Sequence, residues 1–312
     1  MTDQVHYAPL GSLTLAYETF GDDTDPPILL IMGLGAQMLV WPDALCEQLA
    51  GEGYWVVRFD NRDAGLSSHC PGQGGSSPWR VLLRSTVGVS PGAGYDLETM
   101  AGDTLGLMDY LGLDSAHIIG ASMGGMIAQV LAARHPSRVR SLGLIMSNSG
   151  APGIARPDWR LLAGVMLQAR WRGDGDELDA KARALSAIGS RRFPTPHGVI
   201  RERLVRAESR STDSTGATRQ LAAVLATGDR RALLARIACP TIVIHGDEDP
   251  LIPPEAGLDL ARHIHGARFE LIHGMGHDFP APLLSRVGRT LARTLNTAQE
   301  ALHHGTAARS TG

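Results

Sequence analysis

Residues 116–136, with the sequence AHIIGASMGGMIAQVLAARHP, combine three patterns that one local structure has to satisfy. An apolar run of strand type leads to Ser122, small residues surround this serine, and a helix pattern begins at Met123. Gly120 and Gly124 allow a sharp strand-to-helix turn with a strained backbone. The segment therefore predicts an exposed serine above the amino end of a helix, where backbone amides favour developing negative charge.

The G-x-S-x-G pattern is weak evidence when it stands alone, because the chain contains 37 glycines in 312 residues. Its context strengthens it, since a strand pattern and a helix pattern flank the serine in the order that the turn requires. The alternative is a tight turn that happens to contain a serine. A nucleophilic serine also needs a base, an orienting acid and an oxyanion site, which the rest of the chain has to supply.

Apolar runs alternate with helix patterns along most of the chain. This alternation predicts an α/β fold with a mostly parallel central sheet that is flanked by helices. The expected strands have the sequences SLTLAYETFG, PPILLIMG, YWVVRFD, AHIIGAS, VRSLGLIMS, PTIVIHGDED and RFELIHG. Helices are expected over residues 41–51, 97–111, 123–135 and 281–302.

Two regions interrupt the alternation. Residues 70–95 are rich in Gly, Pro and Ser, and residues 150–237 contain helix patterns without a convincing strand. We therefore expect a core formed by residues 1–149 and 238–302, into which 150–237 is inserted as a helical lid (cap) over the carboxyl edge of the sheet. Plain packing of these helices is the alternative. The small and polar residues 303–312 are predicted to be a disordered tail.

The base is expected on a loop that follows a strand, at the edge where Ser122 emerges. His277 lies on a glycine-flanked loop after the last expected strand, and His273, at the end of that strand, is the runner-up. The acid is expected after a strand between the serine and the histidine in chain order. Asp249 precedes the rigid turn PLIPP and is our choice, with Asp247 as the near rival.

An oxyanion hole needs two backbone donors. The turn at the serine supplies the Met123 N–H. The second donor is expected from the glycine-containing loop MGLGAQ, which follows the strand PPILLI, and we assign it to the Leu34 N–H. A glycine-rich turn after a strand is common, so the sequence supports the assignment of this donor less strongly than it supports the triad.

The charge balance argues against several other protein classes. The chain has 29 basic and 32 acidic residues and no basic run, which gives no support for nucleic-acid or anionic-membrane binding. Neither a signal-peptide pattern nor an apolar stretch of membrane-spanning length is present, so a cytoplasmic protein is expected. The three cysteines, Cys46, Cys70 and Cys239, are scattered without metal-ligand spacing, and we expect no metal and no cofactor.

With these residues placed, the chain resembles the α/β-hydrolase fold family over nearly its full length. The motifs GASMGG, GDEDPLIP, GMGHDFP and RFDNRDAGLSS carry the resemblance. It implies that Ser122 is the nucleophile, Asp249 the acid and His277 the base, in the family's chain order.

The chain departs from the family pattern at two places. Most members have His-Gly where this sequence has Met32-Gly33, and Arg-Gly where it has Arg62-Asp63. Both departures, together with the sequence VWPD at residues 40–43, resemble the branch that includes aclacinomycin methylesterase and related esterases.

The resemblance implies a serine carboxylesterase that hydrolyses small-molecule esters through an acyl-enzyme on Ser122. An apolar portion of the substrate is expected, because the lid is rich in apolar side chains. These are Ile154, Trp159, Leu161, Leu162, Met166, Trp171 and Phe193. A C–C bond hydrolase or an aminopeptidase with the same triad is the alternative. A non-catalytic hydrolase scaffold that binds small molecules is a third interpretation, because fold alone does not define function.

Overall fold

The computed structural model describes residues 4–70, 80–81, 92, 94–154, 161, 177–213 and 215–310, with side chains as far as residue 300. Eight strands form one sheet in the order β1-β2-β4-β3-β5-β6-β7-β8. They are β1 (His6–Leu10), β2 (Leu13–Phe20), β3 (Pro27–Ile31), β4 (Trp55–Phe59), β5 (Ala116–Ala121), β6 (Val139–Ile145), β7 (Thr241–Gly246) and β8 (Arg268–Ile272). The pairs β1–β2 and β2–β4 are antiparallel, whereas all the others are parallel.

The predicted α/β fold is confirmed, and each expected strand is present. The central strands β3, β4 and β5 are buried along their whole length, because helices cover both of their faces. The sequence pattern missed β1. Its residues HYAPL include a proline and form an edge hairpin with β2, which a search for long apolar runs does not detect.

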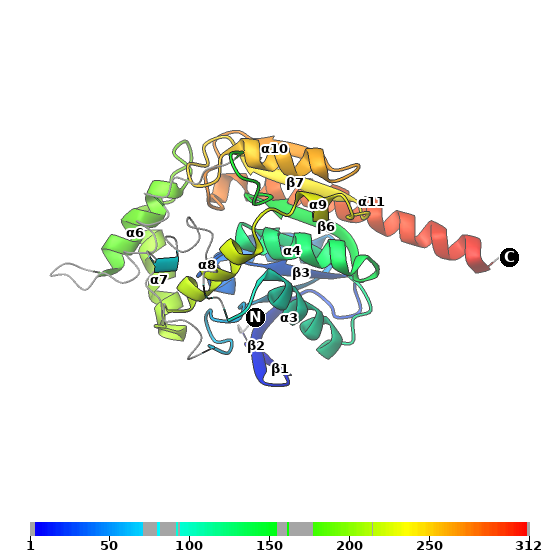
Figure 1. Cartoon of the computed structure of the whole chain (residues 1–312), viewed down its shortest axis with the longest axis horizontal. Coiled ribbons are helices and arrows are strands. Elements are labelled where there is room, and N and C mark those ends of the chain that lie inside the picture. The colour runs from blue at the N-terminus through cyan, green and yellow to red at the C-terminus, as the bar shows by residue number, and fades with distance from the viewer. Residues whose placement is uncertain are drawn as a thin grey trace.

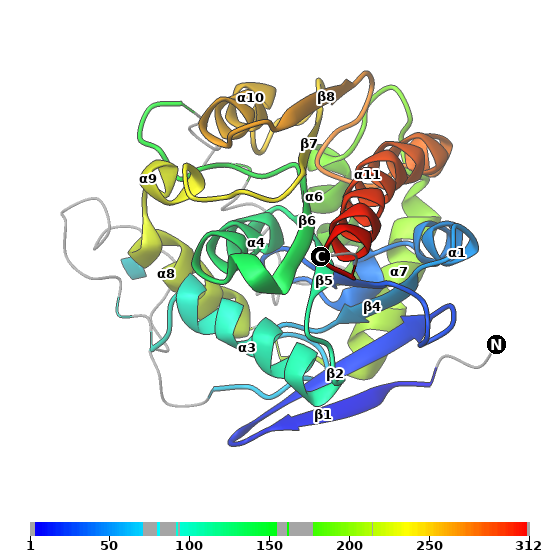
Figure 2. The same cartoon turned by 90° about the vertical axis from the view of Figure 1, so that its right-hand side faces the viewer.

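Two layers of helices enclose the sheet, as Figure 2 shows. Helices α1 (Asp43–Gly51) and α11 (Leu284–Ser310) pack on one face. Helices α3 (Leu97–Tyr110), α4 (Met123–Arg134) and α10 (Pro254–His263) pack on the other. The sheet is thus the middle layer of three.

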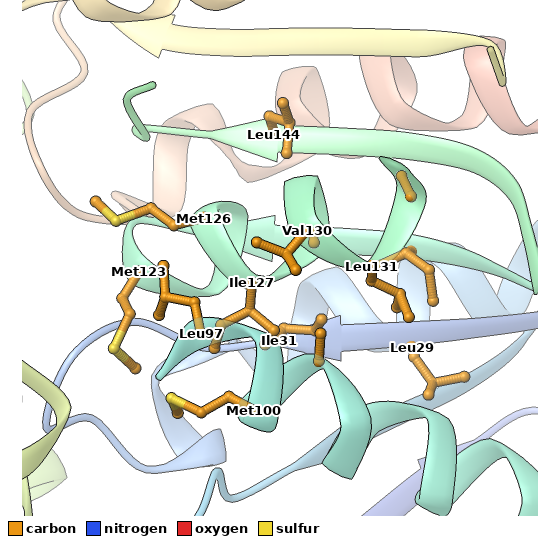
Figure 3. Close-up of a cluster of buried hydrophobic side chains, with 14 of the residues drawn as sticks. Leu29, Ile31, Leu97, Met100, Met123, Met126, Ile127, Val130, Leu131 and Leu144 are labelled. Carbon is orange, nitrogen blue, oxygen red and sulfur yellow. The ribbon is translucent and has the colours of Figure 1, made fainter. Parts of the chain in front are cut away.

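Helix α4 is buried on all sides from Met123 to Ala133. Figure 3 shows Ile127 and Leu131 of α4 beside Ile31 and Leu29 of β3. A helix that is buried all round is fixed by its neighbours rather than by its own amphipathic pattern. This packing holds rigidly the turn that precedes α4.

Within the described part of residues 150–237, four helices are defined between β6 and β7 and no strand is present, as the sequence pattern predicts. They are α6 (Glu177–Ile188), α7 (His197–Arg210), α8 (Gly216–Thr227) and α9 (Arg231–Leu234). Figure 1 shows α6 and α7 at the end of the molecule opposite to the C-terminus. None of the helices in the described ranges is both long and apolar enough to cross a membrane.

The predicted tail and the region 70–95 are described to different extents. Helix α11 continues to Ser310, so residues 303–310 are helical where a disordered tail was expected; Ala307 and Ala308 favour this helix, although Gly305 does not. The Gly/Pro/Ser-rich region 70–95 lies mostly outside the described residues. Within it, Val81 is buried against Leu221 and Ala222 of α8.

Candidate active site

Ser122 lies between β5 and α4 with φ +53° and ψ −120°, a conformation that side-chain-bearing residues rarely adopt. The neighbouring glycines make the turn possible. A Cβ at Gly120 would collide with the Gly124 carbonyl, and a Cβ at Gly124 would collide with the carbonyl of Ile31 in β3. The backbone strain and these two close approaches are the local features that the sequence predicts for a nucleophile turn.

We expect Gly124→Ala to lower the free energy of unfolding by more than about 2 kcal/mol, because the new methyl group forces α4 away from β3. The matched control is Gly102→Ala in α3, where no heavy atom lies within 4 Å of the added Cβ. Its expected effect is a gain of about 0.5–1 kcal/mol, since alanine favours helix more than glycine does. Urea unfolding of both variants measures the difference, and equal stabilities would contradict this account of the turn.

The three expected triad residues follow three different strands and meet at one edge of the sheet. His277 Nε2 lies 3.1 Å from Ser122 Oγ, and His277 Nδ1 lies 2.7 Å from Asp249 Oδ2. Because a carboxylate only accepts hydrogen bonds, His277 Nδ1 carries the proton and donates it. Nε2 is then the acceptor that faces the serine hydroxyl, which is the tautomer that a general base requires.

The Asp249 carboxylate is fully buried and well satisfied. Its Oδ1 accepts hydrogen bonds from the amides of Leu251 and Ile252 at 2.9 and 2.8 Å. Burial alone would raise the pKa of Asp249, but its electrostatic interaction with His277 and hydrogen bonds from His245 and His277 hold this pKa well below its usual range. Asp249 is therefore an ionised carboxylate that accepts a hydrogen bond from His277.

The rival residues form a separate pair. His273 Nδ1 lies 2.8 Å from Asp247 Oδ2, and the His273 side chain is 66% exposed. Asp247 Oδ1 accepts the amide hydrogen of Gly274. This second Asp–His pair is thus a hydrogen-bonded pair on the protein surface, and the structure places neither residue in hydrogen-bond contact with Ser122.

His245 is a further neighbour of the acid, and the sequence pattern does not single it out. It is completely buried in β7, and its Nε2 lies 2.8 Å from the Ile252 carbonyl oxygen and 3.4 Å from Asp249 Oδ2. No spacing rule signals this contact, because it depends on how residues 247–252 turn back toward β7.

The loop after β3 lies directly against the serine. A Cβ at Gly33 would lie 3.0 Å from Ser122 Cβ and 3.5 Å from its Oγ. Among the described residues, no acceptor pairs with the backbone N–H of Leu34 or of Met123. Both expected oxyanion donors are therefore available to a ligand.

The loop that carries His277 is hydrogen-bonded to the end of α6 and to the connection between α6 and α7. The His277 amide donates to the Ile188 carbonyl oxygen at 2.8 Å. Ser190 Oγ donates to Asp278 Oδ1 at 2.6 Å and accepts from the Gly276 amide at 2.8 Å. These contacts join residues about 90 positions apart in the chain, so local sequence patterns gave no sign of them.

A cavity of about 460 Å³ reaches His277 and Leu34. Its apolar wall comes from the expected core and from the segment 150–237, mainly from α6 and α7. The apolar lining residues are Leu34, Ala36, Leu39, Val40, Ala64, Ala184, Leu185, Ile188, Pro194, Ile200, Leu204, Ala207, Ala217 and Phe279. A volume of this size accommodates a drug-sized organic molecule.

The lining differs from the seven lid residues named from the sequence. Trp159, Leu162, Met166 and Trp171 lie outside the described residues. The other three are described, and none of them lines the cavity. Its apolar residues from the segment 150–237 instead come mainly from α6 and α7, with Pro194 between these helices and Ala217 of α8.

Comparisons with known proteins show the fold family and the named proteins to which the chain is similar. The model of the alpha/beta hydrolase fold family matches residues 26–280. Rhodomycin D methylesterase from Streptomyces peucetius is 28% identical over 286 residues, which cover 86% of this chain and 90% of the methylesterase. 3-Oxoadipate enol-lactonase 2 from Acinetobacter baylyi is 26% identical, over 83% of this chain and 85% of its own. The crystal structure of the enol-lactonase from Burkholderia xenovorans LB400 superposes with a TM-score of 0.72 at 25% identity, covering 93% of this chain and 100% of that one.

Proposed function

The chain belongs to the alpha/beta hydrolase fold family, and we propose that it is a serine carboxylesterase with Ser122, His277 and Asp249 as its catalytic triad. One observation carries the proposal: the continuous hydrogen bonds from Asp249 through His277 to Ser122, at 2.7 and 3.1 Å. The similarity to proteins named as a methylesterase and as enol-lactonases supports ester chemistry.

The proposed reaction has two halves. Ser122 Oγ attacks the ester carbonyl carbon while His277 Nε2 takes its proton, and the carbonyl oxygen becomes an oxyanion that the amides of Leu34 and Met123 bind. His277 then gives the proton to the departing alkoxide, which leaves as an alcohol. A water molecule, deprotonated by His277, attacks the acyl-enzyme, and the acid is released as Ser122 regains its proton.

The cavity supports an ester with a sizeable apolar portion as the substrate, because apolar side chains dominate its wall. The acidic residues at the start of α6 argue against an aminopeptidase. Glu177 pairs with Lys181 at 2.8 Å and Asp179 with Arg201 at 3.2 Å, so both are already engaged as ion pairs instead of pointing at a substrate amine.

We also propose that residues 150–237 form the lid of this site. Helices α6 and α7 contribute Leu185, Ile188, Ile200 and Leu204 to the cavity wall, which makes the insertion one side of the substrate pocket. Substrate preference would then depend mainly on this insertion, while the core supplies the chemistry.

The test is hydrolysis of a series of p-nitrophenyl esters of increasing acyl length by the full chain, together with labelling by a fluorophosphonate. We expect steady turnover, with one label per chain that peptide mass spectrometry places on Ser122. The 460 Å³ cavity predicts that kcat/KM rises with acyl length over the short members of the series, as more apolar surface is buried. A folded protein that neither hydrolyses any of the esters nor becomes labelled would exclude a serine esterase.

A further inference from the structure

The position of the Leu34 amide depends on a short loop that has no regular secondary structure. Gly33 lies against Ser122, the Ala36 amide donates to the Gly33 carbonyl oxygen at 3.3 Å, and Gly35 has φ +67°. A loop of this kind needs contacts from outside to hold one conformation, since each of its residues loses backbone entropy on ordering.

Helix α8 provides such a contact. The Gly35 amide donates to Gln220 Oε1 at 2.7 Å, and the other end of the same side chain, Nε2, donates to the Arg62 carbonyl oxygen at 2.7 Å. Gln220 is completely buried. Its amide thus bridges the loop after β3 and the loop after β4 and satisfies both polar ends of the buried side chain.

Helix α8 is itself anchored next to Gln220. Arg219 binds the Asp63 carboxylate through two hydrogen bonds of 2.9 and 2.6 Å, and Tyr95 donates to the same carboxylate at 2.6 Å. Asp63 has φ +66° at the position where the family pattern has glycine. Burial would raise its pKa, but Arg219, Tyr95 and the Cys70 amide keep the pKa of Asp63 below its usual value, so this anchor stays ionised.

Close backbone packing completes the attachment. A Cβ at Gly216 would collide with the Asp63 carbonyl oxygen, and a Cβ at Gly35 would lie 2.9 Å from the Ala217 side chain. The first turn of α8 therefore sits against both loops with no room for a larger residue. Gln220 therefore lies on a helix that is packed and hydrogen-bonded directly against both loops.

We propose that Gln220 is a positioning residue for the oxyanion site: through Gly35 it fixes the Leu34 N–H at the place where the transition-state oxyanion forms. This inference rests on the proposed function. Gln220 touches neither the substrate nor Ser122 in this scheme, and it acts only through the loop.

Loss of the bridge should affect the transition state more than substrate binding. Removing one oxyanion donor costs about 10²–10³ in kcat, and a donor that is displaced but present should cost less. For Gln220→Met, which has similar length but no amide, we expect kcat to fall by about tenfold or more while KM stays within about twofold.

The matched control is Gln129→Met. Gln129 is also completely buried and also makes two hydrogen bonds, accepting from Arg230 Nε at 3.0 Å and donating to the Asn148 carbonyl oxygen at 3.1 Å. Both variants lose similar polar contacts, so thermal unfolding should show similar losses of stability. Only Gln220→Met should lose kcat. A trifluoromethyl ketone forms an oxyanion with the serine, and its affinity should fall by a corresponding factor in Gln220→Met but not in Gln129→Met.

A conservative variant separates positioning from general stability. Gln220→Glu keeps an acceptor for the Gly35 amide but loses the donor to Arg62 and buries a charge. If Gln220 acts by holding Gly35, the glutamate variant retains more kcat than the methionine variant, and a purely structural role predicts the reverse order. If Gln220→Met does not fold, Gln220→Asn replaces it as the variant without the bridge, because the asparagine side chain is too short to reach Gly35.

The outcomes are distinguishable. If wild type hydrolyses esters but Gln220→Met keeps its kcat, or if Gln129→Met loses as much, the inference about Gln220 is overturned while the esterase remains. If wild type hydrolyses no ester and is not labelled by a fluorophosphonate, the proposed function fails and the inference fails with it.

Discussion

Replacing Ser122 by alanine is expected to lower kcat for p-nitrophenyl ester hydrolysis by at least about 10⁴-fold, because no other atom can form the acyl-enzyme. The fold should survive. Ser122 has φ +53°, and alanine there carries the same Cβ, so the substitution removes one hydroxyl and its hydrogen bond to His277 without adding backbone strain. Steady-state kinetics and fluorophosphonate labelling measure the effect, and both signals should disappear together.

The control for this variant is Ser115→Ala. Ser115 lies at the opposite end of β5 from Ser122, and its hydroxyl accepts a hydrogen bond from Arg140 at 2.9 Å. Activity of this control should stay within about twofold of wild type. Residual activity in Ser122→Ala above about one thousandth of wild type, with a purity that excludes contamination, would show that another residue is the nucleophile.

The fold was predictable because its signals are local and repeat. Buried parallel strands appear as continuous apolar runs, and each of the seven expected runs forms a strand of the sheet. The edge strand β1 and the end of α11 were not predicted, because neither has such a signal. Strand β1 is a short hairpin strand that contains a proline, and the end of α11 is a segment with several small residues that continues the preceding helix.

The triad geometry was predictable for a different reason. Ser122, Asp249 and His277 each follow a parallel strand, and the carboxyl ends of parallel strands meet at one edge of the sheet. Strand assignment alone therefore brought these loops together. The assignment of catalytic roles to them stays a prediction until the variants are measured.

Contacts between the helical insertion and the loops were beyond sequence reasoning. Gln220 and Gly35 are 185 positions apart, and the sequence around neither residue indicates that the two are hydrogen-bonded. The Arg62-Asp63 departure was visible in the sequence, but its consequence was not. Only the structure pairs Asp63 with Arg219 and so turns a departure from the family's glycine into an anchor for α8.

Asp249→Asn is expected to lower kcat by about 10⁴-fold while the site stays folded. The asparagine oxygen can still accept from the amides of Leu251 and Ile252 in place of Oδ1, which leaves its NH₂ group facing His277 Nδ1. An NH₂ group cannot accept a hydrogen bond, so the imidazole proton moves to Nε2. Nε2 then no longer accepts the proton of Ser122, so His277 cannot act as the base although its side chain is still in place.

The matched control is Asp247→Asn, which changes the exposed Asp–His pair in the same way. Its kcat should stay within about twofold of wild type, since Asp247 pairs with His273, away from the nucleophile. If both asparagine variants lost activity equally, the orienting role of Asp249 would be wrong.

The depressed pKa of Asp249 also predicts how the effect of Asp249→Asn on stability changes with pH. The folded pKa of Asp249 is depressed, so its ionised form contributes stability above the unfolded value of about 3.9, and this contribution is lost as pH falls through that value and below. Asparagine does not titrate. The stability difference between wild type and Asp249→Asn, measured by urea unfolding, should therefore shrink as the pH is lowered from neutrality into the acid range. A difference that stayed constant would mean that Asp249 is not held ionised by His277, and the charge that orients the base would have to come from elsewhere.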